Sequence, residues 1–168
     1  MASRQPLIGL GLVLAALLLG GCAVGGGPPP PRVSDLADAG DGRFRASQRL
    51  VLEGLDADER GRPDAARARY ERALQADSSN PWAYLALARH YVDADQPRPA
   101  LRHAERAAAL FESLDWESPG ALVHCDGLRG AALALEGRDD EARLLLERAA
   151  RNAPSVWGDG HLAAAELR

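Results

Sequence analysis

A spaced pattern of small and large apolar residues occurs three times in this chain of 168 residues. Within each copy the residues recur at every third or fourth position, which places them on one face of an α-helix. The copies are Ala66, Tyr70 and Ala73; Ala100, Ala104 and Ala107; and Ala142, Leu146 and Ala149. The first two copies begin 34 positions apart (100 − 66) and the last two 42 apart (142 − 100), so we expect a helical repeat with eight inserted residues before its third unit.

The central unit adds a matching first helix, in which Tyr84, Leu87, Ala88 and Tyr91 follow helical spacing. A 34-residue period with this order of large, small and aromatic residues resembles the tetratricopeptide repeat (TPR). The resemblance implies an all-α, superhelical solenoid over residues 43–168, built from three antiparallel helix pairs and a C-terminal capping helix. The pairs and the cap are expected at about 47–80, 81–114, 123–156 and 157–168.

Local sequence features agree with these boundaries. Asn80 and Pro81 form a helix start, in which Asn caps the helix and Pro occupies its first position. Gly54 and Gly130 stand where a small residue lets two helices approach each other closely. We expect the inserted residues in a loop within 111–120, where Ser, Pro and Gly follow one another.

Composition limits the class of protein. Apolar residues make up 46% of the chain and charged residues 26%, which is typical of a globular protein. The 20 basic residues are all arginine, and they are interspersed with 24 acidic residues to give a net charge of −4. A nucleic-acid-binding surface needs clustered positive charge, so we expect no nucleic-acid partner.

The amino terminus has the features of an export signal: Arg4, an apolar run from Leu7 to Leu19, and small residues before Cys22. The run is short for a membrane span, which needs about 20 apolar residues. The sequence Leu19-Gly20-Gly21-Cys22 also resembles the bacterial lipobox. That resemblance implies that residues 1–21 are a cleaved signal peptide and that Cys22 carries lipid. An uncleaved anchor, extended by two further apolar residues, is the alternative.

Residues 22–42 are then a lipidated tether, rich in Gly and Pro between 25 and 31. At up to ~3.5 Å per residue, residues 23–34 can hold the domain up to about 40 Å from a bilayer. Ala23 stands where an aspartate would, in enterobacterial sorting, favour the inner membrane. The resemblance therefore implies the periplasmic leaflet of the outer membrane, with the lipid as the membrane contact.

No residue pattern in the chain predicts catalysis. His124, Cys125 and Asp126 are consecutive, and consecutive helical side chains point about 100° apart, so these three cannot converge on a substrate or a metal. The other histidines lack metal-ligand spacing, and the sequence has no nucleophile, zinc or phosphate-loop motif. We expect no enzymatic activity, no cofactor and no metal site, and we expect Cys125 to be a buried apolar residue.

The TPR resemblance also implies that the first helices of the pairs line a concave groove that binds a peptide or a helix. The residues it places there are Gln48, Val51, Leu55, Asp58, Trp82, Leu85, Arg89, Val92, His124 and Ala131. An exposed Trp82 beside Arg89 has the composition of a binding hot spot, and packing of Trp82 against a neighbouring helix is the comparable alternative. The TPR subfamily that binds a C-terminal carboxylate uses Lys and Asn in this groove. Three apolar residues and His124 take those places here, so that activity is not implied.

These features together predict a lipid-anchored periplasmic scaffold that binds another cell-envelope protein. Small TPR lipoproteins of this kind accompany pilus, secretion and outer-membrane assembly machines, and such a machine is the setting that the resemblance implies. The alternative is a structural lipoprotein that associates with itself, for example as a homodimer, without a separate client.

Overall fold

The computed structural model describes residues 29–36, 40–113 and 119–168. The predicted signal peptide, Cys22 and the glycine-rich part of the tether lie outside these residues. The described residues form helices and no strand, in the order η1 (Val33–Leu36), α1 (Gly42–Glu59), α2 (Pro63–Ala76), α3 (Pro81–Asp93), α4 (Pro97–Ser113), α5 (Pro119–Leu135), α6 (Asp139–Asn152), α7 (Pro154–Trp157) and α8 (Ala164–Leu167). The predicted all-α fold class is confirmed. Among these helices none is long and apolar enough to cross a membrane.

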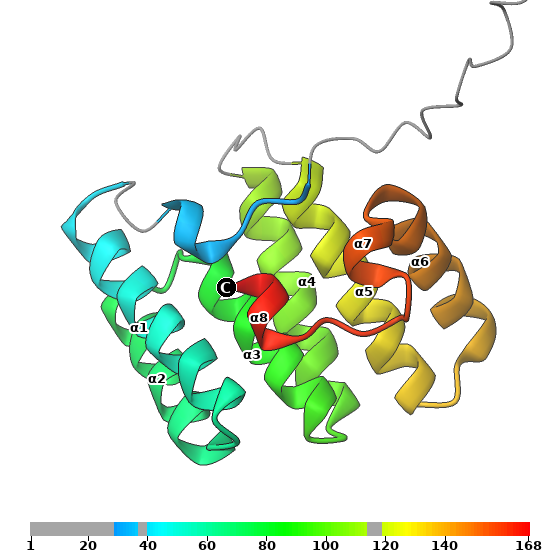
Figure 1. Ribbon diagram of the computed structural model, residues 1–168, viewed down its shortest axis with the longest axis horizontal. Helices are drawn as coiled ribbons and strands as arrows, with labels where there is room; N and C mark the ends of the chain where they lie inside the picture. Colours follow the sequence, from blue (N-terminus) through cyan, green and yellow to red (C-terminus); the bar gives the residue numbers. More distant parts are fainter. Residues whose placement is uncertain (1–28, 37–39, 114–118) are drawn as a thin grey trace, which may run out of the picture.

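Six of the helices form three antiparallel pairs, α1 with α2, α3 with α4 and α5 with α6, and each pair packs against the next. Figure 1 shows the pairs side by side, from α1 and α2 at one end of the molecule to α5 and α6 at the other. Helix α3 contacts both α1 and α5, so these three helices form one layer of the solenoid. We call the side of this layer on which η1 and α8 lie the inner face (Figure 1).

Local chemistry at the helix starts explains their boundaries. The Asp41 carboxylate caps α1 by accepting hydrogen bonds, each at 2.9 Å, from the backbone N–H groups of Arg43 and Phe44. The Asn80 side chain caps α3 by accepting from the N–H of Trp82 at 3.0 Å, which confirms the predicted helix start. Helices α2, α3 and α4 each begin with a proline, whose missing N–H has no helical partner at that position.

Close helix contacts depend on the small residues of the repeat pattern. A methyl group on Gly54 of α1 would lie 2.3 Å from Cε1 of Tyr70 on α2. A methyl group on Gly130 of α5 would lie 2.9 Å from Cγ of Leu146 on α6. Both distances are shorter than a normal carbon–carbon contact of about 3.5 Å, so these two crossings require glycine. The predicted close approach of helices at both glycines is confirmed.

The C-terminal segment departs from the expected single cap over the third repeat. Its helix α7 packs against α6, whereas α8 contacts α1 in the first repeat (Figure 1). Gly160, between the two helices, has a φ of +78°, which a glycine adopts without strain and which turns the chain back. Leu162 and Leu167 are then buried in the common core. The expectation of a cap on the third repeat is therefore wrong for α8, and Leu144 on α6 remains 62% exposed.

Part of the predicted tether belongs to the folded domain. Pro30 and Val33 are buried, and η1 contacts α1. A methyl group on Gly120 would lie 2.6 Å from Cδ of Pro31, so the prolines pack against the start of α5. The expectation that the whole proline run is a free spacer is wrong, because these apolar rings have a surface to cover. The chain between Cys22 and Pro30 can span at most about 25 Å, instead of about 40 Å.

The inserted residues separate the second and third pairs. Helix α4 ends at Ser113 and α5 begins at Pro119, and residues 114–118 lie outside the described part of the chain. Gly120 was expected in the loop but lies in the first turn of α5. Pro119 is suited to the first position of a helix, which explains the earlier start.

Candidate binding groove

The residues predicted to line a groove lie in the core beneath the inner face. Seven of them are at most 3% exposed: Gln48, Val51, Leu55, Trp82, Leu85, Arg89 and His124. Val92 and Ala131 are partly buried. Val33 of η1 and Leu162 and Leu167 of the C-terminal segment belong to the same apolar core. In this structure the chain's own two end segments therefore occupy the side on which a ligand was expected.

Trp82 is a packing residue in this arrangement. It is 0% exposed, and its ring meets that of Phe111 on α4 edge to face, with centroids 5.1 Å apart. The expectation of an exposed Trp82 is wrong because the neighbouring helix and the core cover the indole. The packing alternative is correct for Trp82, while the use of this face by a ligand stays a prediction.

Gln48 takes part in a buried polar cluster that joins α1 to the start of α3. The Asn80 side chain donates hydrogen bonds to Oγ of Ser47 at 2.8 Å and to Oε1 of Gln48 at 2.9 Å. Ser47 in turn donates to the backbone carbonyl of Ala73 at 2.9 Å. Because the amide oxygen of Gln48 accepts from Asn80 inside the protein, it serves the fold and is not presented to a ligand.

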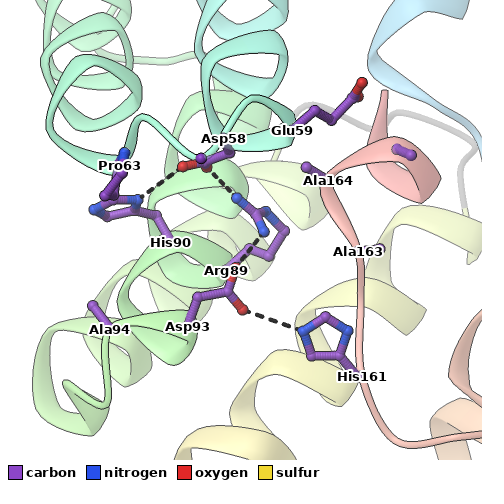
Figure 2. Close-up of a pocket in the computed structure, with 12 residues that line it drawn as sticks. Asp58, Glu59, Pro63, Arg89, His90, Asp93, Ala94, His161, Ala163 and Ala164 are labelled. Atoms are coloured by element: carbon purple, nitrogen blue, oxygen red, sulfur yellow. Dashed lines mark hydrogen bonds and ion pairs between the residues drawn. The ribbon is translucent and has the colours of Figure 1, made fainter.

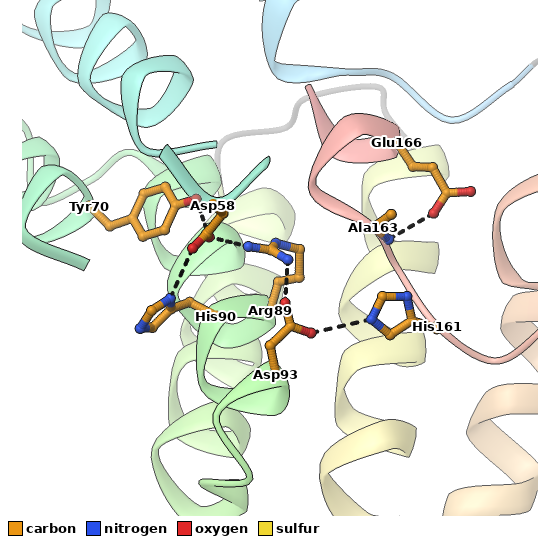
Figure 3. Close-up of polar contacts among 8 residues, drawn as sticks. All are labelled: Asp58, Tyr70, Arg89, His90, Asp93, His161, Ala163 and Glu166. Atoms are coloured by element: carbon orange, nitrogen blue, oxygen red, sulfur yellow. Dashed lines mark hydrogen bonds and ion pairs between the residues drawn. The ribbon is translucent and has the colours of Figure 1, made fainter. Parts of the chain in front are cut away.

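A buried ion-pair network joins the ends of α1 and α3 (Figure 3). The guanidinium of Arg89 donates to the carboxylates of Asp58 and Asp93, the latter at 2.5 Å. The Tyr70 hydroxyl donates to Asp58 at 2.8 Å, and Nδ1 of His90 lies 3.4 Å from the other oxygen of that carboxylate. The Arg89 side chain is 3% exposed and that of Asp58 10%, so removing Arg89 would leave the Asp58 carboxylate without its buried counter-charge.

Burial and neighbouring groups together set the charges of this network. Burial opposes ionisation of Asp58, but the hydrogen bond with His90, the charge of Arg89 and the Tyr70 hydroxyl outweigh it and lower the pKa of Asp58. Burial also opposes the charge on Arg89, and Asp93 is the main group that raises its pKa again. Burial raises the pKa of Tyr70, which stays a neutral donor. Asp58 and Arg89 therefore form a fixed ion pair at neutral pH.

A cavity of about 550 Å³ lies beside this network, between the ends of α1 and α3 and the C-terminal segment (Figure 2). Its helix side carries three carboxylates and one guanidinium, from Asp58, Glu59, Asp93 and Arg89, together with the imidazole of His90. Its other side is formed by His161 and the three alanines of residues 163–165. Nε2 of His161 lies 3.3 Å from Oδ1 of Asp93 and links the two sides.

The consecutive residues His124, Cys125 and Asp126 do not form a joint site. Nδ1 of His124 accepts a hydrogen bond from Nε1 of Trp157 at 3.3 Å, whereas Asp126 pairs with Arg148 at 2.6 Å. Cys125 is 1% exposed, as predicted, and burial raises the pKa of its thiol, so it remains a protonated, apolar residue. In the described ranges no group of three or more His, Cys, Asp or Glu side chains is placed to hold a metal ion.

Sequence reasoning assigned Asp58 and Arg89 to one face but did not predict that they pair. They lie 31 positions apart, close to one repeat period, so opposite charges near equivalent positions of successive repeats are the feature that could have revealed the pair. Tyr70 and Asp93 were not identified as their partners. No sequence feature pointed to His161, because its contact with Asp93 spans 68 positions.

Comparison with known proteins agrees with this architecture. Residues 59–113 match the tetratricopeptide repeat family. Among solved structures, the chain is similar to the N-terminal domain of stress-induced protein-1 (STI-1) from C. elegans, with a TM-score of 0.58 and 17% sequence identity. The alignment covers 76% of this chain and 98% of that one, and at this identity it shows the fold alone. No curated protein sequence matches the chain.

The three helix pairs have the fold of a TPR-type helical solenoid, and residues 59–113 within it match the tetratricopeptide repeat. Folds of this class are stacks of helices that present extended surfaces to other proteins and peptides. The domain is accordingly a protein–protein interaction scaffold.

Proposed function

We propose that this chain is a lipid-anchored scaffold that faces the periplasm and holds another cell-envelope protein close to the membrane. One observation carries the proposal: a lipobox-like sequence, Leu19-Gly20-Gly21-Cys22, precedes a TPR domain whose first helix begins at Gly42. Lipid on Cys22 attaches the chain to a membrane, and the TPR domain binds the client. Because Ala23, and not an aspartate, follows Cys22, the lipid is inserted in the periplasmic leaflet of the outer membrane. A pilus, secretion or outer-membrane assembly machine is the setting.

The packed part of the tether supports a particular orientation on the membrane. Pro31 packs against Gly120 at the start of α5, so the tether leaves the domain at that edge. Helices α1 and α3 end at the opposite edge, where the cavity beside Asp58 and Arg89 lies. A tether that spans at most about 25 Å keeps the first edge near the bilayer and directs the second edge toward the periplasm.

Self-association is the second candidate function. Leu135 at the end of α5 is 43% exposed, and Leu144 on α6 is 62% exposed. Both belong to the last repeat, where α8 does not cover the helices. A second copy that covers these leucines would give a homodimeric structural lipoprotein without a separate client.

Membrane attachment is tested by fractionating cells of the native host. The mature chain is expected to begin at lipidated Cys22 and to fractionate with membranes. Cys22→Ser should release the chain from membranes or leave the precursor uncleaved. Cys125→Ser is the matched control, because that thiol is buried in the domain, and it should leave fractionation unchanged. A mature chain with an unmodified amino terminus upstream of Cys22 would contradict the proposal.

Client binding is tested by crosslinking in the same cells, followed by mass spectrometry of the captured proteins. We expect an envelope protein that is enriched with the wild-type chain and reduced when Cys22→Ser removes the anchor. Capture of copies of this chain alone, together with a stable dimer at low concentration, would favour the structural candidate instead.

A further inference from the structure

We propose that the C-terminal segment, residues 158–168, is an intramolecular ligand of the inner face and that the client displaces it with a segment of similar chemistry. The displacing segment is a short amphipathic helical turn with two leucine-sized side chains and a basic side chain. This inference rests on the proposed function and specifies the kind of partner that the scaffold takes.

The segment is seated on the inner face mainly by apolar side chains. Leu162 is 2% exposed, Ala164 8% and Leu167 0%, and all three belong to the common core. The Glu166 carboxylate accepts from the backbone N–H of Ala163 at 2.8 Å, so the turn stabilises itself in the way of a bound helical peptide. The contact therefore resembles a short helical peptide on a groove, with Leu167 at the end of the helical turn and Leu162 two residues before the turn begins.

The polar contacts of the segment lie at its rim and hold it weakly. His161 contacts Asp93 at 3.3 Å, where the two side chains are 56% and 38% exposed. Nη1 of Arg168 contacts Glu59 at 3.2 Å, where the side chains are 47% and 30% exposed. Pairs as exposed as these contribute little to stability. The segment follows the glycine turn at Gly160, so it can open without unfolding the helix pairs.

The cavity shows that the segment fills the inner face incompletely. Its three alanines, residues 163–165, face a space of about 550 Å³ that larger side chains could occupy. The opposite wall holds the carboxylates of Asp58, Glu59 and Asp93 against the single guanidinium of Arg89. A client segment with a long basic side chain at the place of Ala165 would fill this space and meet an excess of negative charge. It would then have contacts that the intramolecular segment lacks.

Tethering explains why a client has to compete. A segment joined by a short flexible linker has an effective concentration on the order of millimolar at its own site. A free peptide of the same sequence therefore binds only those wild-type molecules whose C-terminal segment has left the inner face. Its apparent affinity equals its intrinsic affinity multiplied by the fraction of such molecules. Substitutions that weaken the intramolecular contact should reveal the site.

The test uses the full chain, purified in detergent, and a fluorescent peptide of residues 158–168 whose binding is followed by anisotropy. Leu167→Asp removes a buried anchor from the intramolecular segment and should tighten peptide binding at least tenfold. Arg168→Glu reverses the exposed contact with Glu59, leaves the core intact and should tighten binding several-fold. Arg151→Glu is the matched control, since it makes the same exchange as Arg168→Glu at an exposed site on α6, and it should leave binding as in the wild type.

Two altered peptides test the chemistry of the client. A peptide that carries Ala165→Arg should bind the Leu167→Asp variant of the full chain at least fivefold more tightly than the unaltered peptide does. Added salt should reduce this gain in affinity. A peptide with Ala165→Glu, of opposite charge, should bind more weakly. Equal binding of the two would overturn the assignment of a basic client segment.

If Leu167→Asp and Arg168→Glu both fold and neither binds the peptide, the inference is overturned. If Leu167→Asp fails to fold, the result for Arg168→Glu alone decides. Equal binding to the wild type and to all variants would place the peptide outside the inner face and would overturn it as well. A stable wild-type dimer formed by exchange of this segment would assign the site to a second copy and overturn the separate client. Because this assay needs neither membrane nor client, its failure leaves the crosslinking result to decide the proposed function independently.

Discussion

Lowering the pH from 7 to 5 is expected to destabilise the domain through one buried histidine, His124. Its ring is 0% exposed and accepts a hydrogen bond from Nε1 of Trp157 at 3.3 Å, which suits the neutral form. Burial lowers the pKa of His124 from 6.5 to about 4. Because the pKa is lower in the folded state, the unfolded chain binds a proton first. The stabilisation is therefore complete above pH 6.5 and is lost as the pH falls toward 4.

The size of the effect follows from the pKa difference between the two states. A difference of 2.5 units (6.5 − 4) corresponds to about 3 kcal/mol over the whole range. Between pH 7 and pH 5 the linkage relation gives a loss of about 2 kcal/mol in the free energy of unfolding. Urea unfolding at constant ionic strength, followed by circular dichroism, measures this loss. Asp58 does not contribute to the loss of stability between pH 7 and pH 5, because its pKa in the folded state is lowered from 3.8. The stabilisation that it provides is lost only at more acidic pH.

Two variants separate His124 from the other titrating groups. His124→Asn keeps an acceptor near the position of Nδ1 but cannot titrate, so it should be less stable at pH 7 yet change by less than about 0.5 kcal/mol down to pH 5. His103→Gln is the control: burial also lowers the pKa of His103, but its side chain is only partly buried. Most of the pH dependence should survive in that variant. An unchanged pH dependence in His124→Asn would refute the reasoning.

Gly130→Leu is expected to lower the free energy of unfolding by about 1–3 kcal/mol, because its side chain would overlap Leu146 across the α5–α6 contact. Gly42→Leu is the control, since a methyl group there has no atom within 4 Å and should change stability by less than about 0.5 kcal/mol; equal stabilities would show that the third repeat is packed differently. Trp82→Ala should cost about 3–5 kcal/mol in urea unfolding, because the indole is fully buried against Phe111. If Trp82→Ala leaves the melting temperature unaltered, the packing interpretation is wrong and Trp82 is an exposed binding residue.

The helix pairs could be predicted from the sequence because their determinants are local. The 34-residue spacing, the Asn80 cap and the glycines at helix crossings act within one repeat or between neighbours, and they appear in the structure where they were expected. The course of the C-terminal segment could not be predicted in the same way. A turn at Gly160 permits many directions, and the burial of Leu162 and Leu167 that selects one of them depends on distant helices.

The candidate site was predictable only as a set of positions. The repeat assigned Arg89 and Asp58 to the layer of first helices, but periodicity carries no information on what covers that layer. Once the end segments cover it, Arg89 needs a buried counter-charge and Trp82 needs an apolar neighbour, and both are supplied by side chains of the domain itself. The cavity arises because alanines, instead of larger residues, meet this surface, which a pattern of apolar spacing does not distinguish.

The two end segments also contact each other, and under the proposed function this contact would link client binding to the membrane anchor. The backbone N–H of Ser34 donates to the carbonyl of Arg168 at 3.0 Å, and η1 and α8 both contact α1. A client that displaces the C-terminal segment would remove the hydrogen-bond partner of Ser34, and it would thereby weaken the packing of the tether on the domain. Release of the tether would lengthen its reach from about 25 Å toward about 40 Å. Coupling between two binding events is reciprocal. A tether that is packed on the domain would therefore lower the affinity for the client, and a released tether, which lets the domain extend from the membrane, would raise that affinity.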